Sequence, residues 1–251
     1  MTVLGKSSAM PDAGGANSGY LLSHEGFKLL VDCGNGVFAK LREHSDPAEV
    51  DVVLITHLHP DHVLDLYPFS HALTYHSGRS VRRPLLWAPP GAAEAFATAG
   101  AVFGAGSQVS DAFTLTEYDP VLELVVGPLT IVLREVPHFV RTWACDVRSE
   151  DGRRFTYGAD CGPSDAIVAL ARDTDLLMLE ATEGAGPHQG GGFRGHMTAE
   201  EAGGIGRRAA AKRLLLTHYS DKLDAAALRH AAEEQFGGPV ELAAAAARYT
   251  V

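Results

Sequence analysis

The segment Leu54-Ile-Thr-His-Leu-His-Pro-Asp-His-Val63 carries four potential metal ligands directly behind an apolar run. These four are His57, His59, Asp61 and His62. Alternate residues at the end of a strand point the same way, so the first two histidines can hold one ion together. The other two lie past the next turn and face elsewhere. The segment therefore predicts a metal site, and a second ion held partly by the other two would make it a two-metal centre.

A surface loop that happens to be rich in histidine is the alternative explanation, because the chain contains 12 histidines. Two histidines at this spacing can arise by chance. Four ligand-type side chains in one hexapeptide, directly after Val50-Asp-Val-Val-Leu-Ile-Thr56, are much harder to explain in that way. The metal site is therefore the favoured interpretation.

The order His-x-His-x-Asp-His at residues 57–62 resembles the signature of the metallo-β-lactamase fold hydrolases at every position. Members of that family complete the site with a later histidine, an aspartate that bridges two metals and a final histidine after a strand. Three residues match in that order, namely His138, Asp160 and His218. Each of them follows a strand-like run. Taken singly, each is weak evidence, since a lone histidine is more often a packing or surface residue, but the complete set is strong.

The resemblance implies a division of ligands between two ions. One ion is held by His57, His59 and His138. The other is held by Asp61, His62 and His218, with Asp160 bridging the two. Zinc is the expected metal because most of these ligands are imidazoles, and manganese is the alternative because the site also has carboxylates. We also count Asp61 among the catalytic residues.

Length and composition favour a single α/β domain over residues 1–251, since 46% hydrophobic content can bury one substantial core. No apolar run reaches the roughly 18 residues that a membrane span needs, and the N-terminus lacks the features of a signal peptide. We therefore expect a cytoplasmic protein without membrane contact. The three cysteines form no spaced pair, which argues against disulfides and a thiolate zinc site. Cys161 follows Asp160 and lies either near the metals or in the core.

Apolar periodicity predicts many short strands with helices between them, which fits an αββα sandwich. The resemblance implies that the metal site lies along one edge of this sandwich. The expected strands are Thr2–Leu4, Gly19–Ser23, Lys28–Asp32, Val50–Thr56, Leu85–Trp87, Phe113–Glu117, Leu122–Val125, Leu129–Glu135, Ala144–Ser149, Arg154–Gly158, Leu176–Glu180 and Lys212–Thr217. The expected helices are Val63–His76, Gly91–Ala99, Ser164–Arg172, Ala199–Ala211 and Ala225–Phe236. Ser164 and Thr198 are expected N-caps, the latter within a capping box. The tail Leu242–Ala247 fits a helix or a strand equally well.

Two further segments resemble the RNase Z-type phosphodiesterase branch of the family. Gly195-His-Met-Thr198 matches a His-x-Thr motif whose histidine gives a proton to the leaving oxygen, and Leu179-Glu-Ala-Thr182 matches a segment whose carboxylate orients that histidine. The resemblance thus implies that His196 and Glu180 are catalytic. The alternatives are a mobile surface histidine in a glycine-rich loop and a strand-end carboxylate that caps a neighbouring loop.

The substrate is expected to be small. Members of this branch that process tRNA often carry a projecting arm between the third-motif histidine and the bridging aspartate, whereas here His138 and Asp160 are separated by one β-hairpin around Glu150-Asp-Gly152. The net charge of −10 also argues against long RNA, because nucleic-acid affinity comes from Lys and Arg that neutralise phosphates. In the same region, Asp146 stands where relatives tend to place a Gly-Tyr-Arg-like strand, which puts an anion-binding role there in doubt.

These observations predict a binuclear metal hydrolase, namely a phosphodiesterase acting on a small cyclic nucleotide or a similar phosphodiester. Two other functions stay open at this point. One is hydrolysis of a carbon ester, lactone or thioester, and the other is metal-dependent binding of a nucleotide without turnover. The resemblance further implies a homodimer, and no tRNA partner is expected.

Overall fold

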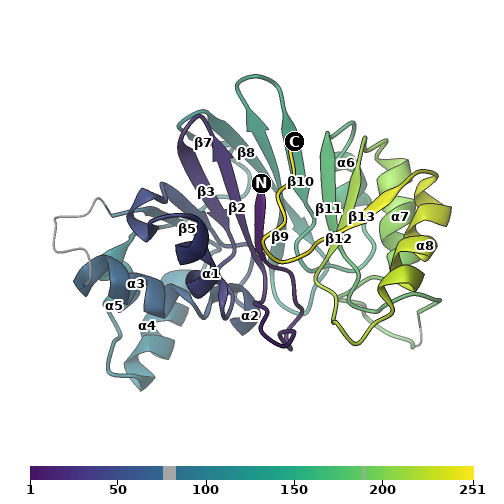
Figure 1. Ribbon diagram of the computed structural model, residues 1–251. Coiled ribbons are helices and arrows are strands. Elements are labelled where there is room, and N and C mark those ends of the chain that lie inside the picture. Colours follow the sequence, from purple (N-terminus) through teal and green to yellow (C-terminus); the bar gives the residue numbers. More distant parts are fainter. Residues whose placement is uncertain (76–82, 189) are drawn as a thin grey trace.

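The computed structural model of the protein describes residues 1–75, 83–188 and 190–251. Two β-sheets pack face to face, and helices cover their outer faces, so the predicted αββα sandwich is confirmed (Figure 1). The first sheet has the strand order β1-β2-β3-β4-β5-β6. Its strands are β1 (Thr2–Gly5), β2 (Gly19–His24), β3 (Phe27–Val31), β4 (Val52–Leu54), β5 (Leu85–Ala88) and β6 (Thr114–Glu117).

The second sheet has the order β13-β12-β11-β10-β9-β8-β7. Its strands are β7 (Leu124–Val126), β8 (Leu129–Val136), β9 (Thr142–Ser149), β10 (Arg154–Tyr157), β11 (Leu176–Glu180), β12 (Leu214–Thr217) and β13 (Val240–Leu242). Strands β9 and β10 form an antiparallel hairpin, so the interval between His138 and Asp160 holds no projecting arm.

The core has three layers because the central strands are buried on both faces. In β4, Val52 and Leu54 point into the layer between the sheets, where they meet Trp143 and Tyr157 of the second sheet. Val53 points the other way, under the helices of the first half. This alternation follows from the period of two in a β-strand, and it explains why these strands read as continuous apolar runs.

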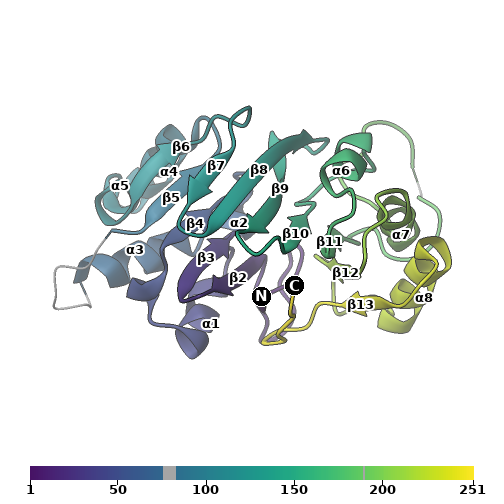
Figure 2. The same ribbon diagram turned by 90° about the horizontal axis from the view of Figure 1, so that it is seen from above.

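The helices lie outside the sheets in two groups (Figure 2). The first sheet is accompanied by α1 (Val37–His44), α3 (Leu66–Tyr75), α4 (Ala92–Val102) and α5 (Gln108–Ala112), and the second by α6 (Asp165–Leu170), α7 (Ala199–Arg208) and α8 (Ala225–Phe236). Ser164 caps α6, and Thr198 forms the predicted capping box on α7. Among the described residues, no helix is both long and apolar enough to cross a membrane.

Several element boundaries differ from the sequence-based prediction. Helix α1 was not predicted, because its N-cap is Gly36 in the left-handed region and offers no side-chain cap. The helix expected over Val63–His76 is divided into α2 (Pro60–Val63) and α3, and His76 lies outside the described residues. In the tail, strand β13 ends at Leu242, and no helix or strand follows it before the end of the chain.

One edge of the sandwich gathers the carboxyl ends of several strands. Strands β3 and β4 run parallel, as do β10, β11 and β12. Strand β8 runs in the same direction as β10, since both are antiparallel to β9. The loops after these strands therefore emerge at a common edge, and every candidate site residue lies in them or at a strand end.

Candidate metal centre

The histidine-rich segment leaves β4 and enters the short helix α2, which begins at Pro60. Asp61 and His62 are held in the first turn of this helix, and both are buried. The backbone around Gly34 lies against this turn, because a Cβ on Gly34 would come within 1.9 Å of the Asp61 carbonyl oxygen. The N–H of Cys33 donates to the His62 carbonyl at 2.8 Å. The glycine after β3 therefore permits the close contact that fixes the ligand turn.

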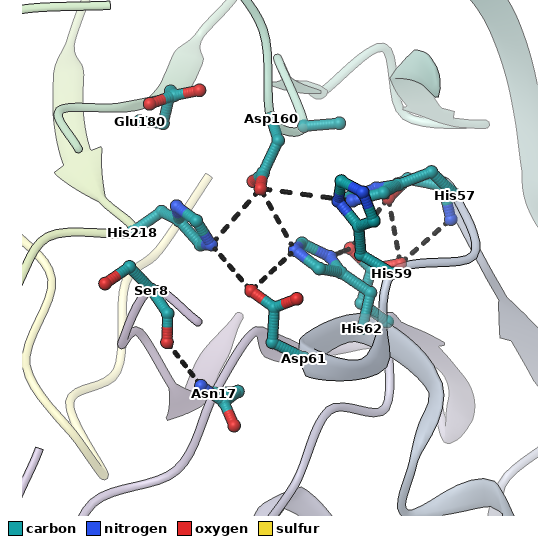
Figure 3. A network of polar contacts seen from close by, with 12 residues as sticks. Ser8, Asn17, His57, His59, Asp61, His62, Asp160, Glu180 and His218 are labelled. Atoms are coloured by element: carbon teal, nitrogen blue, oxygen red, sulfur yellow. Dashed lines mark hydrogen bonds and ion pairs between the residues drawn. The ribbon is translucent and has the colours of Figure 1, made fainter. Parts of the chain in front are cut away.

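The structure brings the sequence-predicted ligands together in two groups that share Asp160. In each group the ligand atoms lie within 4.8 Å of one another, and the groups are His57, His59, His138, Asp160 and Asp61, His62, Asp160, His218. Figure 3 shows Asp160 between His218 and His57. Oδ2 of Asp160 lies 3.3 Å from Nε2 of His218 and 3.9 Å from Nε2 of His57. One carboxylate thus faces both groups.

Polar atoms without partners show that these residues fit metal ions. Nε2 of His57, Nε2 of His62 and Oδ1 of Asp160 are buried and have no hydrogen-bond partner among the described residues. Such orphaned atoms are costly unless a cation or another group satisfies them. Burial, together with the nearby His62, lowers the pKa of His57 well below its usual value, and burial lowers that of His138 to about 4. Neutral imidazole is the form that binds metals.

Asp160 is suited to the same task. Burial acts to raise the pKa of its carboxyl group, but the charges of His218 and His62 outweigh burial and hold the pKa well below the ordinary value. The carboxylate is therefore ionised at neutral pH. A buried anion that faces four imidazoles can hold metal ions.

The far ring nitrogens of the ligand histidines contact neighbouring groups that set their orientation. Nδ1 of His62 donates to Asp32 at 2.8 Å, and Nδ1 of His138 donates to the Gly195 carbonyl at 2.6 Å. Nδ1 of His218 lies 2.9 Å from the hydroxyl of Thr182. These contacts leave Nε2 of each ring aimed at the site, which is the usual role of such partners around a metal.

Asp32 is a site residue that the sequence analysis missed. It follows β3, adopts a φ of 59° and is fully buried. Besides His62, its carboxylate accepts hydrogen bonds from the backbone N–H and the hydroxyl of Thr56. The available signal was the position of a carboxylate at the end of a buried strand, next to the strand that carries the histidine motif. Asp32 joins the two strands and orients His62.

Replacing Asp32 with asparagine is expected to weaken metal binding by about 10- to 100-fold, because His62 loses an anionic acceptor. Competition with a chromogenic chelator measures this change. The control is Asp146→Asn, since Asp146 is equally buried but pairs with Arg148 and Arg154 on β9 and β10. That variant should lose thermal stability and keep its metal affinity. Equal losses of affinity in the two variants would contradict the orienting role of Asp32. The role of Asp146 is structural, because its carboxylate joins neighbouring strands through Arg148, Arg154 and Thr156.

Strained backbone occurs where the ligands leave the sheet. His218 has a φ of 51° and Ala159, directly before Asp160, has a φ of 54°. Left-handed conformations at residues other than glycine cost roughly 1–3 kcal/mol and cluster at functional sites. Next to His218, the carbonyl of Tyr219 accepts a hydrogen bond from Nζ of Lys6 at 2.8 Å. This contact helps to hold the final histidine in its turn.

His196 and Glu180 form a hydrogen-bonded pair beside the ligand groups. Nδ1 of His196 donates to Oε1 of Glu180 at 2.8 Å, and the His196 ring contacts those of His138 and His218. Glu180 is buried at the end of β11 and also accepts the backbone N–H of Cys161 at 2.7 Å. Burial acts to lower the pKa of His196, but the hydrogen bond to Glu180 and its charge raise the pKa overall. Nδ1 is thus engaged, and Nε2 is left for a substrate.

The structure therefore brings together every residue that the sequence analysis assigned to the site. It adds Asp32, Thr182 and the Gly195 carbonyl. Cys161 is buried with its thiol near the Ala159 carbonyl, and burial raises the pKa of that thiol well above its usual value, so it is a packed residue. Asn17 donates to the carbonyl of Ser8 close to Asp61 and His218 (Figure 3).

Comparisons with known proteins agree with this geometry. Residues 28–219 match the model of the beta-lactamase superfamily domain. The probable metallo-hydrolase YhfI of Bacillus subtilis is 31% identical over 252 residues, covering 97% of this chain and 96% of that protein. A ribonuclease Z of Halorubrum lacusprofundi is 28% identical over 286 residues, covering 95% and 92% of the two chains.

Solved structures extend the likeness to the whole architecture. The crystal structure of YhfI superposes with a TM-score of 0.87 at 29% identity, and covers 98% of this chain and 96% of that one. The short form of human tRNase Z superposes with a TM-score of 0.76 at 21% identity, with the same coverage of each chain. The second likeness concerns the fold alone.

Proposed function

The chain belongs to the beta-lactamase superfamily and is a metallo-hydrolase, and we propose that it is a phosphodiesterase for a small substrate such as a cyclic nucleotide. The observation that carries the proposal is the His196–Glu180 pair beside two ligand groups that share Asp160. A phosphodiester needs two things from such a site. Its negative charge must be neutralised, and its leaving oxygen must receive a proton.

The proposed ligand division assigns one ion to His57, His59 and His138 and the other to Asp61, His62 and His218, with Asp160 serving both. Zinc is the proposed metal, and manganese is the alternative. Divalent cations bound there supply Lewis acidity, which acidifies water and neutralises phosphate charge.

The protein's own residues supply the proton and the orientation. His196 is partly exposed, and its Nε2 is directed away from Glu180, so it can give a proton to the leaving oxygen of a bound diester. Glu180 keeps the ring in one orientation and stabilises its protonated form. An alkyl phosphodiester expels an alkoxide, which leaves readily only when it receives a proton, so the pair supports phosphodiester hydrolysis.

The first experiment compares substrates directly. Metal-loaded protein should hydrolyse bis(p-nitrophenyl) phosphate and a cyclic mononucleotide much faster than p-nitrophenyl acetate or a lactone. Faster turnover of the carbon esters would overturn the phosphodiesterase proposal. Binding of the nucleotide without turnover of any compound would favour a nucleotide-binding protein. Light scattering tests the further proposal that the protein forms a homodimer, and a single cooperative unfolding transition would support the proposal that residues 1–251 act as one domain.

Precursor tRNA is expected to be a poor substrate. Its folded body needs a docking surface, but the segment between His138 and Asp160 is only the β9–β10 hairpin, and the net charge is −10. Phosphate contacts supply much of the affinity for RNA, and in this chain the 31 acidic residues outnumber the 21 Lys and Arg residues. Processing assays at physiological salt, with a ribonuclease Z as the positive control, measure the effect. Efficient, site-specific removal of a 3′ trailer would contradict a small-substrate enzyme.

A further inference from the structure

Exposed apolar side chains gather beside the proposed proton donor. Phe139 is 61% exposed and Phe193 is 65% exposed, and Val140 is also exposed. The rings of Phe139 and Phe193 lie 5.9 Å apart at an angle of 71°, and the ring of Phe139 lies 5.8 Å from that of His196. We call Phe139, Val140 and Phe193 the aromatic shelf. It joins the loop after β8 to the glycine-rich loop before α7.

The shelf is held in place by the site. Phe139 directly follows His138, whose Nδ1 donates to the Gly195 carbonyl. The Phe139 ring packs closely against Gly195, because a Cβ at that position would come within 2.5 Å of Cε2 of Phe139. Arg194 fixes the same loop through ion pairs with Glu183 and Glu201. The ring thus has a defined position beside His196.

These phenyl rings contribute little to folding where they are. Apolar stabilisation is proportional to the area removed from water, and both rings keep more than half of their surface in solvent. Adjacent exposed apolar groups at the edge of a site typically mark a ligand surface. Two exposed rings that contact each other next to a proton donor are therefore suited to bind a ligand with an aromatic or apolar part.

We propose that the aromatic shelf stacks against the planar base of a nucleotide and so selects nucleotide phosphodiesters over diesters without a base. This inference rests on the proposed phosphodiesterase function. His196 protonates the leaving oxygen, so the part of the substrate that bears this oxygen lies on the His196 side, where the shelf is. For a cyclic nucleotide that part is the nucleoside. Stacking on phenyl faces tolerates every base, so the shelf selects for a base and not for its identity.

The test compares two substrates that differ only in the base. They are adenosine 3′,5′-cyclic phosphate and the same cyclic ribose phosphate with hydrogen in place of adenine. Phe139→Leu and Phe193→Leu keep apolar bulk and remove the ring face. Because the rings lie at 71° to each other, one base stacks on only one of them, so at least one of the two variants should lower the ratio of kcat/KM for the two substrates by about tenfold, the usual worth of one stacked base. Phe103→Leu is the matched control, because Phe103 is 71% exposed at the end of α4 and should leave the ratio unchanged.

An unchanged ratio in both shelf variants would overturn the inference. So would loss of metal from Phe139→Leu, since the ring would then serve to position His138. Binding gives an independent reading that needs no turnover. Adenosine 5′-monophosphate should bind at least one of the two shelf variants about tenfold more weakly than the original protein in calorimetry, and an equal Kd in both would refute stacking. If the original protein hydrolyses neither cyclic compound, the proposed function fails, while this binding comparison still decides the shelf.

Discussion

Replacing Asp160 with alanine should reduce the metal content of the protein from about two ions per chain to less than one. The physical reason is that one carboxylate serves both ligand groups. Its Oδ2 lies within 3.4 Å of Nε2 of His62 and 3.9 Å of Nε2 of His138, so each group loses its only shared anion. The variant also leaves the imidazoles of His62 and His218 facing one another without the carboxylate that lies beside them. Elemental analysis of protein purified without chelator measures the loss, and hydrolysis should fall with it.

His57→Ala is the control variant, because it distinguishes loss of one ligand group from loss of both. His57 belongs to one ligand group only, so its loss should weaken mainly one ion and leave the other bound. A titration with one metal equivalent at a time separates the two cases. If Asp160→Ala and His57→Ala each lose a single ion, Asp160 does not bridge. If the original protein binds one ion or none after reconstitution, the two-ion arrangement itself is wrong.

Much of the fold and the site could be predicted because ligands and strands are both local patterns. The run ending at Thr56 specifies a buried strand, and the next six residues carry four ligand types. The carboxyl ends of parallel strands meet at one edge of a sheet, so the residues after β10 and β12 lie together there, and the residues after β4 of the other sheet meet them across the sandwich. The capping box at Thr198 was readable for the same reason, since both of its partners lie within four residues.

The contacts that orient the ligands could not be predicted, because they join residues that are distant in the sequence. Asp32 meets His62 across 30 positions, and the Gly195 carbonyl meets His138 across 57. A backbone carbonyl has no sequence signature at all. Helix α1 escaped prediction for a different reason, since Gly36 starts it through a left-handed backbone conformation and not through a capping side chain. The same limit applies to the aromatic shelf, whose two rings come from separate loops.

His196→Ala should slow the hydrolysis of an alkyl phosphodiester by about 10²- to 10⁴-fold, because an alkoxide is a poor leaving group without a proton. His196 is the only member of the His196–Glu180 pair that can reach the leaving oxygen, since Glu180 is fully buried behind it. The same substitution should cost far less with bis(p-nitrophenyl) phosphate, because the phenolate leaves unprotonated. The measurement is kcat for the two substrates with metal-loaded protein.

Two comparisons make the interpretation specific. His188→Ala removes a histidine of the same glycine-rich region that pairs with Glu183 at 2.6 Å, and it should not change the ratio of the two rates. Glu180→Gln keeps the size of the side chain but removes the charge that raises the pKa of His196, so it should lower the alkyl rate more than the aryl rate. A uniform loss on both substrates in His196→Ala, or loss of metal from that variant, would mean that His196 positions the substrate or binds metal and does not donate the proton.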